Sequence, residues 1–382
     1  MTLRLHHILP FDLFKQMLDG GYIRSQVHPV HNELMIFNYT EAAQFDRVWN
    51  AATNVCRGLI VVVGPHGLDE NAEVLARPFN KFHNLNTTYV PETMEENLPH
   101  EAPLVTAKLD GSMGILYQWN GQWSVATRGS FDSDQARWAT EWYRGHPIKA
   151  EWVRGYTPVC EIIYAKNRIV VDYDFEGLIL LSMVENSTGA EATRKMVEES
   201  GLKNSIPVVP MFTKTLAQCA AENEPNEEGY VLTYSNNVKV KVKFAEYVRL
   251  HRILTGLNPK AIWELLEAKQ EASITALLAD EKMPEGFREW LRDWATELMV
   301  RYKQLESAAI HAFINTPHQG EGLASYSPEQ LKTARKENAL YYKGFPIVQS
   351  ILFAMLDGKD YAPIIWDRVK PKGNETFKKD ME

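Results

Sequence analysis

Residues 108–128 read KLDGSMGILYQWNGQWSVATR, and this stretch is the clearest indication of the fold of the first part of the chain. It contains an Asn-Gly pair, Asn120-Gly121, between two runs rich in aromatic and β-branched residues, 114–119 and 122–128. Asn-Gly between such runs is the strongest short-range indication of a β-hairpin. The stretch therefore predicts two antiparallel strands shortly after Lys108.

Similar strand patterns recur on both sides of this hairpin. Short apolar runs with β-branched residues occur at 58–63, 158–164, 168–173 and 178–184, and 230–244 repeats the hairpin pattern around Asn236-Asn237. Antiparallel sheets combined with a few separate helices form the α+β class. The chain up to about residue 250 is therefore predicted to be an α+β domain of antiparallel sheets flanked by helices.

Helical patterns replace the strand patterns after that point. Asn258-Pro259 is typical of a helix start, with an N-cap residue followed by proline at the first helical position. Apolar residues of 284–302 recur on one helical face, and residues 327–330 have the form of a capping box. We therefore expect two domains, 1–250 and 251–382, the second of them all helical.

The composition is that of an ordinary globular protein. The 382 residues are 45% hydrophobic and 24% charged, and the net charge of -8 weighs against non-specific binding to duplex nucleic acid. No apolar run approaches the roughly 20 residues of a membrane span, and the first residues lack a secretory signal. Cys56, Cys160 and Cys219 have no paired spacing, which argues against a disulfide framework. We expect a cytoplasmic chain without membrane association.

Three short motifs contain residues that could carry chemistry. In the motif that begins at Lys108, strand alternation points Lys108 and Asp110 the same way, and Gly111 permits a turn. A solvated lysine beside a turn is the alternative. Glu228 precedes a glycine and could hold a metal or cap a turn. Glu161 interrupts an apolar strand, so it should have a partner or face a cleft, because burying an unpaired carboxylate is unfavourable.

A fourth motif is a strand of alternating lysine and valine at 237–244. Period two places Lys239, Lys241 and Lys243 on one face. They form either a cationic ridge suited to a polyphosphate or a half-buried strand with its lysines in water. The chain has no Gly-x-x-x-x-Gly-Lys-Ser/Thr loop and no Gly-x-Gly-x-x-Gly motif, which argues against P-loop and Rossmann chemistry.

The order of these motifs resembles that of the covalent nucleotidyltransferases, which include polynucleotide ligases and mRNA capping enzymes. It runs from Lys-x-Asp-Gly through an acid in a strand and Glu-Gly-Tyr-Val to Lys-x-Lys. Further matches between about residues 36 and 252 resemble the phage-type RNA ligases that repair breaks in tRNA. These matches are Cys56-Arg57-Gly58, Arg77-Pro78 with Lys81-Phe82 and 84–86, Arg128-Gly129-Ser130, 167–170 with Asp172-Tyr173, Glu185-Asn186 with Thr188-Gly189, and Lys241 to Lys243 leading to 247–251.

The resemblance implies a nucleotidyltransferase domain and an ATP-dependent RNA ligase that acts in three steps. Lys108 takes AMP from ATP and expels pyrophosphate, the AMP passes to an RNA 5′-phosphate, and an RNA 3′-hydroxyl then displaces the AMP. The implied cofactors are ATP, with AMP bound covalently, and Mg²⁺, or Mn²⁺ in its place. The implied partner is single-stranded or broken RNA, with tRNA as one candidate. A monomer is expected, in the host-cell cytoplasm if a phage encodes the chain.

The resemblance also implies roles for individual residues. Beside the nucleophile Lys108, it assigns Lys241 and Lys243 to stabilising charge on the α-phosphate. Arg57 and Lys81 resemble residues that bind the leaving pyrophosphate. Asp110, Glu161 and Glu228 resemble acids that hold the metal ion through its waters. Gly111 and Arg128 complete the implied ATP site. Arg128 stands where relatives can have lysine, which keeps the charge but changes the hydrogen-bond geometry.

Two alternatives stay open. A DNA ligase or a capping guanylyltransferase shares the chemistry, although both usually continue into a small β-barrel, and the sequence after Lys243 shows no such strand series. A catalytically silent RNA-binding module would keep the fold without the covalent step. Tyr341-Tyr342 with Lys343 could stack on unpaired bases or belong to the helical core.

Overall fold

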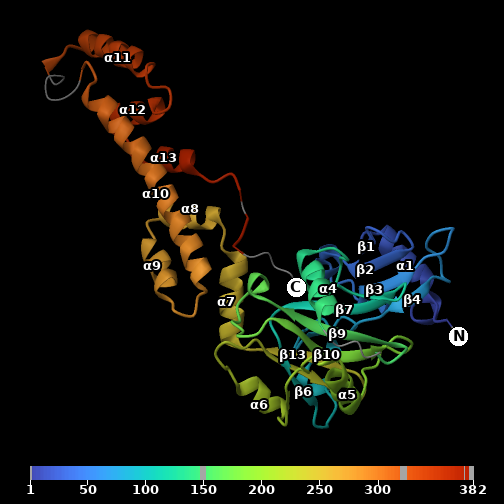
Figure 1. The fold of residues 1–382 in the computed structure, drawn as a ribbon. Helices are drawn as coiled ribbons and strands as arrows, with labels where there is room; N and C mark the ends of the chain where they lie inside the picture. Colours follow the sequence, from blue (N-terminus) through green and yellow to red (C-terminus); the bar gives the residue numbers. More distant parts are fainter. Residues whose placement is uncertain (1, 147–151, 319–324, 374, 378–382) are drawn as a thin grey trace. The chain divides into compact units, whose positions relative to one another are not determined.

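Strands and short helices share the chain up to residue 243, and the elements that the structure describes after it are helices (Figure 1). The structure is a computed structural model, and it describes residues 2–146, 152–318, 325–373 and 375–377. Contacts divide the chain into two compact units, Met1–Arg249 and Leu250–Glu382. The predicted α+β class with antiparallel sheets and a helical C-terminal region is confirmed.

The strands of the first unit form three sheets. Sheet one has the order β1 (Ile23–Val27), β2 (Leu34–Tyr39), β3 (Arg57–Val62) and β4 (Glu73–Ala76). Sheet two has the order β10 (Gly177–Glu185), β9 (Tyr156–Ile163), β7 (Ser112–Trp119) and β8 (Gln122–Ala126). Sheet three has the order β11 (Met211–Phe212), β6 (Leu104–Lys108), β12 (Gly229–Thr233), β13 (Lys239–Lys243) and β5 (His83–Asn84). Neighbouring strands are antiparallel except β13 and β5, which are parallel.

Short helices connect these strands. The α-helices of the first unit are α1 (Phe11–Asp19), α2 (Glu41–Phe45), α3 (Ala51–Val55), α4 (Asp134–Gly145), α5 (Arg194–Asn204) and α6 (Leu216–Ala221). Its 3-10 helices are η1 (Leu5–His7), η2 (Pro91–Thr93), η3 (Glu95–Asn97) and η4 (Ala165–Asn167).

The two predicted hairpins are confirmed. Asn120 and Gly121 have φ of 48° and 76° and join β7 to β8, with Trp119 opposite Gln122. Two left-handed residues in a two-residue turn give the twist that antiparallel strands need. In the other hairpin, β12 and β13, Val240 and Val242 are buried while the lysines of β13 lie on the opposite face.

Strand β2 ties the first two sheets together. Leu34 and Ile36 pack in one cluster with Ile115 of β7, whereas Phe37 on the opposite face packs against Phe14 of α1. This alternation follows from the two-residue period of a strand. Sheet one is therefore covered on both faces, and β7, which follows the Lys108 motif, is anchored to it.

The strand predicted at 168–173 is wrong. These residues form an irregular loop after η4. The backbone N–H groups of Val170 and Val171 donate to Oδ2 of Asp110 at 2.8 and 2.9 Å. Because a side chain 60 residues away in sequence takes these donors, they are not available for a strand ladder, and apolar periodicity could not reveal it.

The second unit is a set of helices. Their bounds are α7 (Ala245–Gly256, which begins in the first unit), α8 (Pro259–Glu267), α9 (Glu271–Ala279), α10 (Glu285–Ile314), α11 (Pro328–Tyr342), α12 (Gln349–Leu356) and α13 (Ala362–Val369). The predicted helix starts are confirmed, since Asn258 caps α8 and Ser327 forms a capping box with Gln330 at α11. Tyr342 is fully buried and accepts from the Thr316 hydroxyl, so this tyrosine belongs to the helical core. Across the described helices, none combines the length and apolar character that a membrane crossing requires.

Candidate active site

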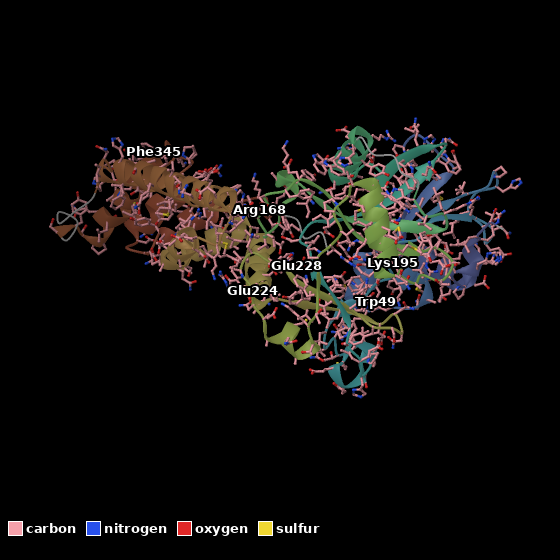
Figure 2. All side chains as sticks on the ribbon, turned by 60° about the horizontal axis from the view of Figure 1, so that its bottom comes forward. Trp49, Arg168, Lys195, Glu224, Glu228 and Phe345 are labelled. Atoms are coloured by element: carbon pink, nitrogen blue, oxygen red, sulfur yellow. The ribbon has the colours of Figure 1, made fainter. Side chains whose placement is uncertain are left out.

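Lys108 lies at the end of β6, beside the start of β12. In sheet three, Gly229 is opposite Lys108 on one side and Lys243 on the other. Glu228 directly precedes Gly229, and its Oε1 lies 2.6 Å from Nζ of Lys108 and 3.4 Å from Nζ of Lys243. The structure therefore brings together three residues that the sequence singled out, and Figure 2 locates Glu228 within the first unit.

This cluster is enclosed, yet its lysines reach solvent. The side chain of Glu228 is 2% exposed, whereas those of Lys108 and Lys243 are 17% and 12% exposed. Burial raises the pKa of Glu228, and the two ammonium groups only partly oppose that rise. The buried carboxylate of Glu228 therefore lies next to two partly exposed amines, those of Lys108 and Lys243.

Glycine at position 229 is a geometric requirement of this arrangement. Gly229 has φ of +141°, and a Cβ there would lie 2.0 Å from the carbonyl oxygen of Val242. Any other residue would push β12 away from β13. The Glu-Gly pair is therefore one physical unit that aims Glu228 between the lysines.

Glu161 of β9 belongs to the same region. It is opposite Met113 of β7, and a Cβ on Gly111 would lie 3.1 Å from its Oε1 and 2.6 Å from the carbonyl oxygen of Ile162. Burial raises the pKa of Glu161 to about 8, with Lys108 opposing the rise and Glu228 adding to it. Glu161 is therefore an acid whose charge needs a cation to be stable near neutral pH.

The Asp110 carboxylate is already occupied by hydrogen bonds. Besides the N–H groups of Val170 and Val171 on Oδ2, the Tyr247 hydroxyl donates to Oδ1 at 2.8 Å. The backbone N–H of Asp110 donates to the Tyr173 hydroxyl at 2.8 Å. Asp110 therefore fixes the turn after β6 against the 170–173 loop and the first turn of α7.

The three predicted acids do not form a ready-made metal cage. Within the described part of the chain, no three acids, histidines or cysteines are grouped as ligands of one metal ion. Glu161 and Glu228 are nevertheless both buried, and each has a raised pKa. A divalent cation fits this donor set chemically, because carboxylate oxygens and waters are the ligands that Mg²⁺ prefers and its charge would stabilise both ionised acids.

A second cluster surrounds Tyr39, which the sequence analysis missed. Nζ of Lys81 and Nη1 of Arg128 approach its hydroxyl at 3.3 and 3.2 Å. Burial alone would raise the pKa of Tyr39, yet Arg128, Arg57 and Lys81 together lower it. Three cations around one phenol oxygen are suited to receiving an anion. No sequence pattern distinguishes Tyr39 from the other tyrosines among the 16 of the chain.

Phe82 joins the two clusters. Its ring lies 5.2 Å from the Arg57 guanidinium and 5.1 Å from Nζ of Lys241. Arg57 also lowers the pKa of Glu161, whereas Lys239 is ion-paired with Glu191. Arg57 therefore acts electrostatically on both Glu161 and Tyr39, and Lys239, although it is ion-paired, lies as close to the Phe82 ring as Arg57 does, at 5.2 Å.

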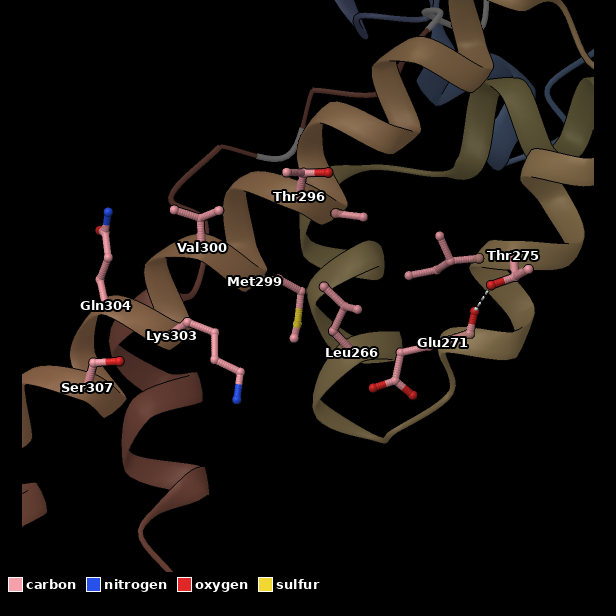
Figure 3. Close-up of a pocket in the computed structure, with 11 residues that line it drawn as sticks. Leu266, Glu271, Thr275, Thr296, Met299, Val300, Lys303, Gln304 and Ser307 are labelled. Carbon is pink, nitrogen blue, oxygen red and sulfur yellow. Dashed lines mark hydrogen bonds between the residues drawn. The ribbon is translucent and has the colours of Figure 1, made fainter. Parts of the chain in front are cut away.

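A cavity in the second unit is a separate feature (Figure 3). It measures about 800 Å³ and lies among α8, α9 and α10, with Leu266, Ile274 and Met299 in its lining. Its lysine, Lys303, pairs with Glu306 at 2.7 Å. The predicted site residues are absent from its lining, so the candidate active site is in the first unit.

Known proteins match the part of the chain that holds Lys108, Glu228 and Lys243, and the three cations around Tyr39. Residues 55–247, half of the chain, match the family described as RNA ligase. The chain is 29% identical over 203 residues to a protein of Thermovibrio ammonificans that is provisionally named an RNA ligase, with 50% of this chain and 52% of that protein covered. It is 24% identical over 302 residues to an RNA ligase of Rhodothermus phage RM378, and this match covers 61% of this chain and 67% of the phage protein. A Naegleria gruberi RNA ligase mutant solved with ATP and Mn is 17% identical, with a TM-score of 0.35. The match covers 45% of this chain and 58% of that one. The chain thus spans about half the length of the first of these relatives.

Proposed function

Because this chain belongs to the RNA ligase family, as the order of its motifs predicts, we propose that it is an ATP-dependent RNA ligase that carries AMP on Lys108. One observation carries the proposal: the amine of Lys108 lies 2.6 Å from buried Glu228, which Lys243 approaches to 3.4 Å. A partly exposed primary amine in a site of acids and cations suits covalent nucleotide transfer.

In the proposed first step, Nζ of Lys108 attacks the α-phosphorus of ATP. A P–N bond forms, the P–O bond to the leaving group breaks, and pyrophosphate departs. The amine must lose a proton first. Glu228 is the counter-ion of this ammonium group, at 2.6 Å. We assign the proton to solvent, which the 17% exposed side chain of Lys108 reaches, so that Glu228 stays ionised.

The cationic residues are proposed to bind the triphosphate. Arg57, Lys81 and Arg128, which converge on Tyr39, would hold the β- and γ-phosphates and then the pyrophosphate. Lys241 and Lys243 would stabilise the negative charge that develops on the α-phosphate. Positive charge held in place before the reaction lowers its barrier without reorganisation.

Asp110, Glu161 and Glu228 are the acids proposed to hold a divalent cation, Mg²⁺ or Mn²⁺. Asp110 would act through water, since its carboxylate already accepts three hydrogen bonds. Such a cation supplies positive charge beside the phosphates when bound.

The later steps would transfer AMP to an RNA 5′-phosphate, releasing Lys108, and join that end to an RNA 3′-hydroxyl, releasing AMP. The proposed partner is single-stranded or broken RNA, with tRNA among the candidates. We propose a monomer acting in the cytoplasm, of the host cell if a phage encodes the chain. The three cysteines are free and buried, which suits a reducing compartment.

Incubation with labelled ATP or GTP, followed by denaturing gels and a sealing assay on broken RNA and on nicked DNA, tests the proposed function. The proposal expects protein labelled from ATP and sealed RNA. Label from GTP alone would indicate a capping enzyme, and sealing of DNA alone would indicate a DNA ligase. Protein that binds RNA but never takes label would be the silent binding module.

A further inference from the structure

A row of aromatic rings extends from the Tyr39 cluster. Tyr39, Trp49, His83 and Tyr89 form this aromatic row, and each meets the next edge to face. The ring centroids are 5.1 Å apart for Tyr39 and Trp49, 5.3 Å for Trp49 and His83, and 6.0 Å for His83 and Tyr89. Edge-to-face contacts are a stable geometry of packed aromatic rings.

The row leads from a buried end to an exposed end. Tyr39 is 4% exposed, Trp49 and His83 are half-buried, and Tyr89 is 42% exposed. His83 belongs to β5, beside Val240 of β13. The row therefore connects the predicted phosphate-binding residues with the protein surface.

Cations accompany the row at both ends. Nζ of Lys81 lies 5.0 Å from the rings of Tyr39 and Trp49, and the exposed Arg47 guanidinium lies 4.5 Å from the ring of Tyr89. No ion pair joins Arg47 or Lys81 to a carboxylate of the described residues. Burial, with Lys81 and Lys241, lowers the pKa of His83 to about 4, so this ring is neutral at pH 7.

We propose that the aromatic row, with Arg47, binds the RNA strand that is to be sealed: an unpaired base stacks at Tyr89, and the phosphates follow Arg47 toward Lys81. This inference rests on the proposed function and names the surface that would receive its substrate. An exposed aromatic ring beside cations that have no carboxylate partner is the combination that binds single-stranded nucleic acid, since bases stack and phosphates need positive charge. Because the whole chain has a net charge of -8, RNA can be attracted only by a local patch of positive charge such as this one.

The test measures RNA binding and adenylation separately. The probe is a fluorescent, 5′-phosphorylated single-stranded RNA of about ten nucleotides, a length within the range of one binding groove. Tyr89→Ala is expected to weaken its binding about tenfold, within the range for the loss of one stacked base, and Arg47→Ala should weaken it through the loss of a phosphate contact. Tyr89→Phe keeps the ring and should bind as the wild type does. Lys203 is an exposed lysine on α5. Lys203→Ala removes one positive charge, as Arg47→Ala does, and should leave RNA binding unchanged.

ATP-dependent labelling should be unchanged in all four variants, because none of these side chains belongs to the proposed ATP site. Equal RNA affinity of Tyr89→Ala, Arg47→Ala and Lys203→Ala would overturn the inference, and so would lost ATP labelling with intact RNA binding. The two proposals fail in different ways. A wild-type protein that takes no label and seals no RNA contradicts the proposed function, whereas normal sealing by Tyr89→Ala contradicts only the role of the row.

Discussion

Nζ of Lys108 lies 2.6 Å from Oε1 of Glu228, a carboxylate that is only 2% exposed. These residues are far apart in sequence and meet because β6 and β12 are neighbouring strands, with Lys108 opposite Gly229. The contact puts an amine, its counter-ion and a second amine, Lys243, in one enclosed place. Most of the proposed chemistry depends on this arrangement.

Replacing Glu228 with glutamine should slow adenylation by about 100-fold, the size of effect typical for loss of one preorganised electrostatic group. Glutamine keeps the shape of the side chain and removes its charge, so the fold should remain. Single-turnover labelling with ATP measures the rate. Glu224→Gln, an exposed acid before the same strand, is the matched control. A Glu228→Gln rate within threefold of the control would remove Glu228 from the mechanism.

Replacing Tyr39 with phenylalanine should raise the KM for ATP about tenfold. The change removes the hydroxyl that binds Lys81 and Arg128 at 3.3 and 3.2 Å, and a hydrogen bond to a charged group contributes about 1.5 kcal/mol or more. Sealing of a pre-adenylated strand, which needs no ATP, should change little. Tyr22→Phe, a half-buried tyrosine outside the cluster, serves as control. An unchanged KM would show that Tyr39 does not organise the triphosphate site.

Replacing Asp110 with alanine should loosen the 170–173 loop. The N–H groups of Val170 and Val171 would lose their acceptor, and each buried donor left unpaired costs about 1–3 kcal/mol. Hydrogen exchange at these two amides should become markedly faster. Asp110→Asn keeps one oxygen acceptor and should show a smaller increase. Exchange rates that match the wild type in both variants would argue against a positioning role for Asp110.

Stability should fall as pH rises through neutrality because of Glu161. Its pKa is about 8 in the folded protein against an ordinary value of 4.5, so between these values the folded state holds a proton that the unfolded state releases. The stabilisation is full below pH 4.5 and is lost as the pH rises toward 8.

Urea unfolding in metal-free buffer at pH 5 and pH 8 measures this dependence. The difference in the free energy of unfolding between wild type and Glu161→Gln should change by up to about 1.4 kcal/mol per pH unit. The wild type should lose more stability as the pH rises. Glutamine cannot titrate, so its slope lacks this contribution. Parallel curves for the two proteins would mean that Glu161 is ionised in the folded state throughout.

The sequence was sufficient wherever a local pattern carries the structure. Asn120-Gly121 predicted the hairpin because two left-handed residues suit a two-residue turn. The alternation in β13 placed Lys241 and Lys243 on one face, and the helix caps at Asn258 and Ser327 followed from local hydrogen bonding.

The remaining features depend on contacts between distant segments. Tyr39 has its altered environment because Lys81 and Arg128 converge on it from other segments of the chain. The loop at 168–173 has the composition of a strand, yet its backbone N–H groups donate to the side chains of Asp110 and Asn226, which are distant in sequence. Lys239 looks equivalent to Lys241 in sequence, yet its ammonium group is held by an ion pair with Glu191 of a distant segment. Such pairings are set by the tertiary fold.

Mass spectrometry of peptides after incubation with ATP and Mg²⁺ would show whether Lys108 carries AMP. We expect one added AMP on the peptide that contains Lys108, and none in Lys108→Ala, which should still seal a pre-adenylated strand weakly. AMP on another residue, or a labelled Lys108→Ala protein, would contradict it.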